Sequence, residues 1–198
     1  MCEPLSDLTD ASPEEFKEQI RKILTGRTRR IHNDPTLICA AVLVPLLWKE
    51  GEWHVLVTQR TQTVGHHKGQ ISFPGGACEP GDGDKLATAL RETFEEVGIA
   101  PESVEVLGAG DDYQTVSSFS VTPFVGVVPF PYEARLNREE VDGLVEVPLS
   151  FLRDPAHLRV ERWEYQDQCH DVLFWDYGPH TVWGATAQML KEFLDLVF

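Results

Sequence analysis

The segment FPGGACEPGDGDKLATALRETFEEVGI, residues 73–99, decides the fold of this chain. Its Gly75–Gly76 pair leads through an acidic turn into a stretch with the periodicity of a helix. Asp84 is a typical helix N-cap, and Gly98 is typical of the left-handed residue that ends a helix. The stretch therefore predicts a short helix packed on a sheet, and the apolar stripe that would face the sheet is Leu86, Leu90, Phe94 and Val97.

Three carboxylates crowd the rest of this predicted helix: Glu92, Glu95 and Glu96. Like charges one turn apart destabilise a helix by a few tenths of a kcal/mol, roughly, for each pair. A divalent cation between Glu92 and Glu96 would reverse this cost, and magnesium is commonly held by one or two carboxylates plus substrate phosphates. Arg91 lies one turn before Glu95 and is expected to steady it. The alternative is an acidic surface helix exposed to solvent.

The segment resembles the Nudix box, whose core pattern is Arg-Glu-x-x-Glu-Glu-x-Gly. The core matches from Arg91 to Gly98, and Ile99 follows it. The loop before the helix is one residue longer than the general pattern. The usual glutamate slot falls on Asp82 when counted forward from Gly76, and on Gly83 when counted back from Arg91. Asp82 or Asp84 would have to take the place of that glutamate.

The residues upstream resemble the coenzyme A pyrophosphatase branch of this family. The two stretches that carry the likeness are LVTQRT (56–61) and HKGQISFPGG (67–76). The resemblance implies an α/β/α sandwich on a mixed sheet, with Mg²⁺ or Mn²⁺ as the metal. It also implies cleavage of coenzyme A or acyl-coenzyme A to adenosine 3′,5′-bisphosphate and (acyl-)4′-phosphopantetheine.

The resemblance also assigns roles to individual residues. The expected metal ligands are Glu92, Glu96 and Glu95. The expected catalytic residues are Glu95, Arg91 and Glu140, with Glu139 as the second choice for the distal glutamate. The alternative for the distal pair, that both are surface acids, is equally open at this point. The expected substrate-binding residues are Arg60, Lys68, Gln70, Gly75 and Gly76.

Two other functions stay open on the sequence alone. One is hydrolysis of another nucleoside diphosphate derivative, such as a nicotinamide dinucleotide or a nucleotide sugar. The other is a non-catalytic Nudix-fold module that only binds a nucleotide. An intact carboxylate set favours an enzyme over this second alternative, because residues 91–98 keep every acid of the core pattern.

Length and charge limit the class of protein. The chain has 198 residues and a formal net charge of −15, and no basic stripe is visible. We expect one domain over residues 13–198 after a loose segment 1–12. A nucleic-acid partner and a membrane span are not expected, the predicted compartment is the cytosol, and the cysteines are predicted to be reduced thiols. The oligomeric state is open between a monomer and a homodimer.

The rest of the chain alternates predicted strands and helices. Ser12–Glu15 (SPEE) is typical of a helix start, residues 37–48 and 53–59 predict a hairpin, and residues 181–198 predict a final helix. Further strands are expected at 70–73, 104–109, 121–128, 145–149, 158–165 and 170–175. This order predicts an α/β sandwich. Five late aromatic residues could either stack on adenine or belong to the core: Trp163, Tyr165, Phe174, Trp175 and Tyr177.

Overall fold

The structure is a computed structural model that describes residues 11–62, 68–165 and 168–198. Within this part, eight strands form a main sheet and three form a second, smaller sheet. The strands of the main sheet are β1 (Ile38–Lys49), β2 (Glu52–Arg60), β3 (Ile71–Ser72), β4 (Gly75–Ala77), β5 (Glu105–Ala109), β6 (Tyr113–Gln114), β7 (Phe119–Val127) and β8 (Val141–Pro148). The smaller sheet contains β9 (Leu158–Tyr165), β10 (Gln168–Tyr177) and β11 (His180–Trp183).

The main sheet is mixed, as predicted. Strands β1 and β7 are parallel, whereas β1 pairs antiparallel with both β2 and β4. Strand β8 pairs antiparallel with β2. The β1–β4 pairing, with Ala41 opposite Gly76, holds the glycine pair beside the centre of the sheet.

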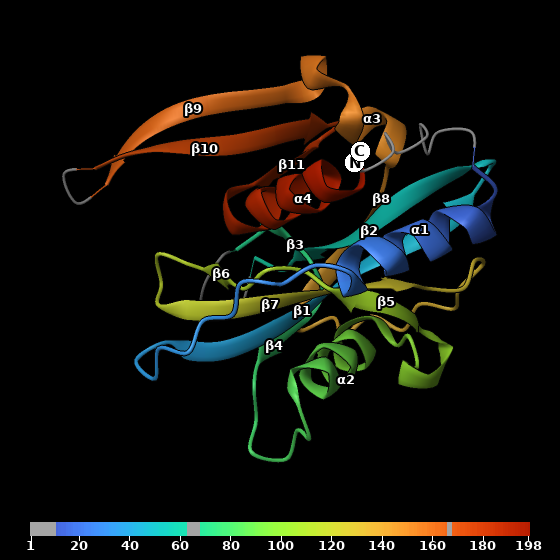
Figure 1. Cartoon of the computed structure of the whole chain (residues 1–198), viewed down its shortest axis with the longest axis horizontal. Helices are drawn as coiled ribbons and strands as arrows, with labels where there is room; N and C mark the ends of the chain where they lie inside the picture. Colours follow the sequence, from blue (N-terminus) through green and yellow to red (C-terminus); the bar gives the residue numbers. More distant parts are fainter. Residues whose placement is uncertain (1–10, 63–67, 166–167) are drawn as a thin grey trace.

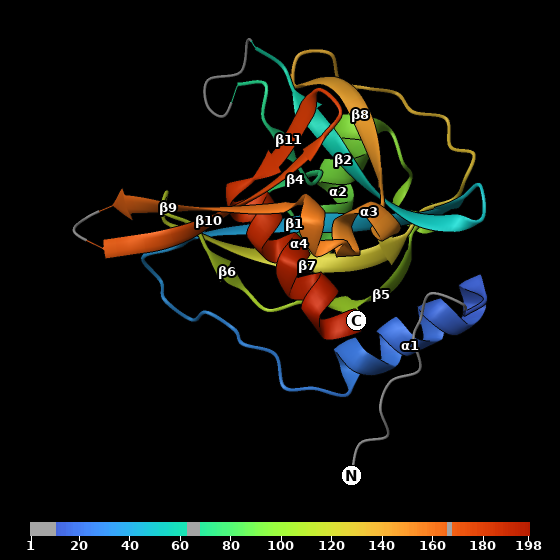
Figure 2. The same cartoon turned by 90° about the horizontal axis from the view of Figure 1, so that it is seen from above.

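Helices cover both faces of the main sheet. Helix α2 (Lys85–Val97) lies on one face, and α1 (Pro13–Thr25) and α4 (Gly184–Val197) lie on the other (Figure 1). Seen from above, α4 crosses the main sheet while α1 runs beside β5 (Figure 2). The short helix α3 (Leu149–Arg153) and the 3-10 turns η2 (Pro101–Ser103) and η3 (Pro155–His157) complete the structure. The α/β/α arrangement predicted from the sequence is therefore present.

Each face of the sheet has its own hydrophobic core. The larger core joins α1 and α4 to the sheet through residues such as Phe16, Val55 and Leu190. The smaller core packs Val97 of α2 against Leu43, which lies on the opposite face of β1 from Val44. Because β1 is covered on both sides, its sequence is a nearly continuous apolar run rather than an alternating one.

Two predictions about helices need correction. The final helix begins at Gly184, because the preceding residues form strand β11 opposite β10. Phe94 is 53% exposed, so it does not belong to the buried stripe of α2. The buried side of α2 instead contains Thr88, Ala89, Thr93, Glu96 and Val97.

The prediction of four reduced thiols is also wrong. Cys39 at the start of β1 and Cys78 just after β4 form a disulfide, with 5.4 Å between their Cα atoms. The β1–β4 pairing brings them opposite each other, since Ala40 and Ala77 are paired neighbours. Cys169 is a free, exposed cysteine.

Three smaller predictions concern the start of α1, the N-terminal segment and membrane-spanning helices. Ser12 caps α1 through a capping box with Glu15, as the sequence predicted. The expected loose segment falls mostly on residues 1–10, which lie outside the described part. No helix in the described part of the chain is long and apolar enough to cross a bilayer.

Candidate active site

The glycine pair allows the helix carboxylates to approach the sheet. A Cβ atom on Gly76 would lie 2.5 Å from the Glu92 Oε1 atom, closer than real Cβ contacts allow. A Cβ atom on Gly75, whose φ is +154°, would lie 2.4 Å from the carbonyl oxygen of Ala41. Gly75 therefore requires glycine because of the neighbouring strand, whereas a side chain at Gly76 would displace the Glu92 carboxylate.

The ends of α2 fix the direction in which its acids point. The Asp84 side chain accepts a hydrogen bond from the Ala87 N–H, and Gly98 ends the helix with φ at +78°. Along the helix the three glutamates differ sharply in exposure. The Glu95 side chain is 52% exposed, that of Glu92 is 16% exposed, and that of Glu96 is only 3% exposed. The three carboxylates thus range from an exposed one, Glu95, to an almost fully buried one, Glu96.

Arg91 joins two of these acids to the preceding loop. Its Nη1 atom donates to Glu92 Oε1 at 2.9 Å and to Glu95 Oε2 at 3.1 Å, which confirms the predicted Arg91–Glu95 pair. Its Nε and Nη2 atoms donate to the two carboxylate oxygens of Asp82 at 2.9 and 3.0 Å. Such a bidentate pair fixes the plane of the guanidinium as well as its position.

Asp82 is held by several hydrogen bonds besides those from Arg91. It also accepts hydrogen bonds from the Thr88 hydroxyl at 2.7 Å and the Glu79 N–H at 2.9 Å. The hydrogen bonds from Arg91, above all, hold the pKa of Asp82 well below its usual range. The sequence left Asp82 and Asp84 as alternatives, and the structure separates them: Asp82 holds Arg91, and Asp84 caps the helix.

Glu96 is the most unusual acid of the site. Burial raises its pKa to about 8, against the opposing attraction of Arg60, whose Nη1 atom lies 4.0 Å from Glu96 Oε1. Within the described residues its Oε2 atom is buried and has no hydrogen-bond partner. A buried polar atom without a partner costs about 1–3 kcal/mol, so its presence in a folded protein needs an explanation.

Glu140 lies close enough to act on the helix acids. Burial raises the pKa of Glu92 and of Glu96, and the negative charge of Glu140 adds to the rise at both. The backbone N–H of Thr61 donates to the Glu140 carbonyl at 2.8 Å, and the Thr61 hydroxyl donates to the Glu139 carbonyl at 2.9 Å. Thr61, directly after β2, thus holds the segment before β8.

The predicted substrate-binding residues differ in exposure and in their position relative to the glutamates. Arg60 ends β2 beside Glu96, and its N–H donates to the Gln70 carbonyl at 2.9 Å. Gln70 is half-buried next to β3, whereas Lys68 is exposed in a turn. Lys68 directly follows residues 63–67, which lie outside the described part.

The site fits a divalent cation through its donor chemistry. Carboxylate oxygens are the ligands that Mg²⁺ and Mn²⁺ prefer, and the buried Glu96 Oε2 atom is one such oxygen without a partner. The described residues contain no cluster of three or more acid, histidine or cysteine side chains arranged for metal binding. An ion would therefore be held by few protein atoms, and substrate phosphates would complete its shell.

The other residues singled out in the sequence have structural contacts. The basic segment 27–30 pairs with two aspartates, through Arg27 to Asp111 at 2.8 Å and through Arg29 to the fully buried Asp112 at 2.5 Å. Trp175 belongs to the larger core and is 1% exposed, so it cannot stack on adenine. Phe174 packs against Trp183, and Tyr177 against Phe151, which also favours the core interpretation.

Comparison with known proteins identifies the relatives of this chain. Residues 38–167 match the NUDIX domain family. The uncharacterized Nudix hydrolase NudL of Enterobacter sp. (strain 638) is 39% identical over 158 residues, covering 77% of this chain and 79% of that protein. The human mitochondrial coenzyme A diphosphatase NUDT8 is 37% identical over 199 residues, covering 96% of this chain and 81% of that protein.

A solved structure agrees with the fold. The MutT/nudix family protein from Enterococcus faecalis aligns with 94% of this chain and 74% of its own, with a TM-score of 0.52 and 16% identity. At this identity the likeness concerns the fold alone. It extends over both the main sheet and the second sheet, because nearly the whole chain is aligned.

Proposed function

The chain belongs to the Nudix hydrolase family, and from this premise we propose that it cleaves the diphosphate of coenzyme A or acyl-coenzyme A. The products would be adenosine 3′,5′-bisphosphate and (acyl-)4′-phosphopantetheine. The observation that carries the substrate assignment is the 37% identity to a coenzyme A diphosphatase over 96% of this chain. The upstream stretches 56–61 and 67–76 support the same branch.

The proposed metal ligands are Glu92, Glu96 and Glu95, and Nudix hydrolases in general use divalent metal ions. We propose Mg²⁺ or Mn²⁺, which when bound would neutralise phosphate oxygens and lower the pKa of an attacking water. Arg91 holds Glu95 and Glu92 in place and is itself held by Asp82. Its contribution is positioning, because its hydrogen bonds fix the carboxylates of Glu92 and Glu95 relative to Asp82.

The remaining residues act on the substrate. Arg60 and Lys68 supply positive charge for the diphosphate, which the net charge of −15 would otherwise repel. Gly75 and Gly76 let the diphosphate approach the backbone. Gln70, directly before β3, contributes a polar contact to the substrate. Glu140 is the proposed base, because it lies in the turn just before β8 and its negative charge adds to the raised pKa of both Glu92 and Glu96. It would accept a proton from the attacking water.

One experiment tests both the substrate and the chemistry. The protein is incubated with coenzyme A and Mg²⁺ in oxygen-18 water, and the products are identified by mass spectrometry. We expect the two predicted products, with the label in one of them. A parallel panel of nicotinamide dinucleotide and nucleotide sugars decides the branch. If coenzyme A turns over no faster than these substrates, the assignment to coenzyme A is wrong.

A single substitution tests the metal ligand. Glu96→Gln removes the charge but keeps the size, and the raised pKa means that Glu96 itself is largely neutral at pH 7 without metal. The metal-free variant should therefore be about as stable as the wild type, yet lose turnover and stabilisation by Mg²⁺. The matched control is Glu102→Gln at an exposed position of η2. Full turnover by Glu96→Gln would contradict the role of Glu96.

A further inference from the structure

Strand β8 is an open edge of the main sheet. Within the described residues it pairs with β2 only, so its other side has no strand partner. Successive residues of a strand direct their N–H and C=O groups to alternate sides. Any three consecutive residues of β8 therefore present at least one N–H and one C=O that β2 cannot reach.

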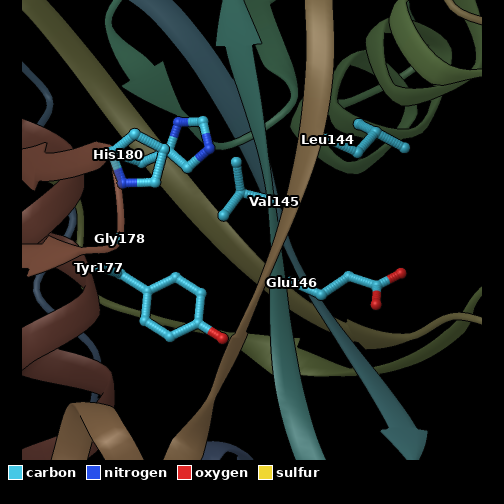
Figure 3. A pocket seen from close by; sticks show the side chains of 7 residues that line it. Leu144, Val145, Glu146, Tyr177, Gly178 and His180 are labelled. Carbon is cyan, nitrogen blue, oxygen red and sulfur yellow. The ribbon is translucent and has the colours of Figure 1, made fainter.

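A hollow of about 650 Å³ lies along this edge. Its other wall is the turn between β10 and β11, and the lining residues are Leu144, Val145, Glu146, Tyr177, Gly178, Pro179 and His180. Val145 faces the Tyr177 and His180 side chains, while Leu144 and Glu146 point to the other side of the strand (Figure 3). The backbone of β8 consequently forms part of the lining.

The hollow offers hydrogen-bonding groups on both of its walls, namely the free edge of β8 and the Tyr177 and His180 side chains. In the described part of the chain, neither the Tyr177 hydroxyl nor the His180 ring makes a hydrogen bond. Glu146 is already paired, since it accepts from Lys49 at 2.7 Å and from the Tyr132 hydroxyl at 2.6 Å. The lining contains no lysine or arginine, so it does not favour a phosphate.

The hollow lies at a definite distance from the candidate active site. Strand β8 begins directly after Glu140, and a strand rises about 3.3 Å per residue. Leu144 to Glu146 therefore lie about 13–20 Å along the strand from Glu140. Strand β11 also lies against β3, which leads into the glycine pair. The hollow lies on the face of β8 that carries Val145, opposite to the face that α2 covers, so an extended group would pass around the free edge of β8 to go from the glutamates to the hollow.

We propose that this hollow binds the amide-bearing pantetheine arm of the substrate along the free edge of β8, an inference that rests on the proposed function. The arm is a flexible, uncharged chain with two amide groups, and amides pair with a free sheet edge as an added peptide strand does. The opposite end of coenzyme A carries a phosphate on its ribose, which a lining without cations would not hold. The hollow therefore selects the arm and not the nucleotide.

The test uses the two products as separate inhibitors of coenzyme A hydrolysis. Pro179→Trp places a bulky side chain at the exposed turn and fills the hollow. We expect it to raise KM for coenzyme A about tenfold and to weaken inhibition by 4′-phosphopantetheine by a similar factor. Inhibition by adenosine 3′,5′-bisphosphate should stay as in the wild type. Pro35→Trp, at an exposed turn remote from the hollow, is the matched control.

A milder variant provides a second test in case Pro179→Trp does not fold. Tyr177→Phe removes only the hydroxyl and should weaken inhibition by 4′-phosphopantetheine about fivefold, as expected for one lost hydrogen bond. If 4′-phosphopantetheine inhibits both variants as strongly as the wild type, and both hydrolyse coenzyme A as the wild type does, the pocket assignment is overturned while the proposed function stands. If the wild type does not cleave coenzyme A, both fall. A loss of dimers on gel filtration without a change in inhibition would show the edge to be a contact between copies, and would also overturn the proposal.

Discussion

Removal of the Cys39–Cys78 disulfide should cost a large part of the stability of this protein. The bond links residues 39 positions apart in the sequence. In the chain-entropy treatment, closing a loop of about 39 residues lowers the free energy of folding by about 4 kcal/mol, because it restricts the unfolded chain. Since whole domains are stable by only about 5–15 kcal/mol, this is a substantial share.

The assay is urea unfolding followed by tryptophan fluorescence. Cys78→Ser should lower the free energy of unfolding by about 4 kcal/mol under non-reducing conditions. Dithiothreitol should lower that of the wild type by the same amount and should leave Cys78→Ser unchanged. Cys169→Ser is the matched control, because Cys169 is exposed and unpaired and its loss should change nothing.

Activity provides a second reading of the same variant. Cys78 lies in the loop that carries Asp82, and its N–H donates to the Cys39 carbonyl at 2.9 Å. Loss of the bond loosens the loop, so kcat should fall by less than when Asp82 itself is removed. If the oxidised wild type and Cys78→Ser unfold at the same urea concentration, the chain-entropy reasoning for this loop is refuted.

Three further substitutions make testable predictions, two in the candidate active site and one at the buried Asp112. Asp82→Ala frees Arg91 and should lower kcat about 10–100-fold, the usual cost of losing a residue that orients metal ligands; steady-state kinetics would measure it, and an unchanged kcat would contradict the role. Gly76→Ala should push Glu92 away from the sheet and weaken Mg²⁺ binding, measured by calorimetry; wild-type affinity would show that the close approach is unnecessary. Asp112→Asn should cost about 3 kcal/mol at pH 7 in urea unfolding. Burial alone would raise the pKa of Asp112, but hydrogen bonds from Thr122 and others outweigh this effect and lower it. The stabilisation by the carboxylate is therefore lost as pH falls below about 4. The difference in free energy of unfolding between the wild type and Asp112→Asn should disappear there.

Local rules correctly predicted the start of α1 and both ends of α2. The caps at Ser12 and Asp84 and the left-handed Gly98 depend on a few neighbouring residues, so the sequence alone contains the information. The pairing of Arg91 with Glu95 is local for the same reason. Helical spacing also brought Glu92 and Glu96 together on one face, whereas the mixed sheet came from the family resemblance.

Other features depended on contacts between distant segments. The periodicity of α2 was correct, but the angle at which it meets the sheet buries Glu96 and leaves Phe94 exposed. The disulfide could not be predicted, because only the register of β1 against β4 places Cys39 opposite Cys78. Strand β11 was missed because four residues before a helix give too short a pattern.

The acidic helix must also fold before any ion is present, and the structure shows how its charges are tolerated. Arg91 shares its Nη1 atom between Glu92 and Glu95, while Asp82 accepts from the rest of the guanidinium. Glu96 lies apart from Arg91, with Arg60 Nη1 4.0 Å from its Oε1 atom, and burial raises its pKa to about 8. If Glu92 and Glu96 held a divalent cation, Arg91 would stay in place because Asp82 holds it. On this reasoning Asp82 allows the same arginine to stabilise the metal-free helix and to yield its carboxylates to the metal.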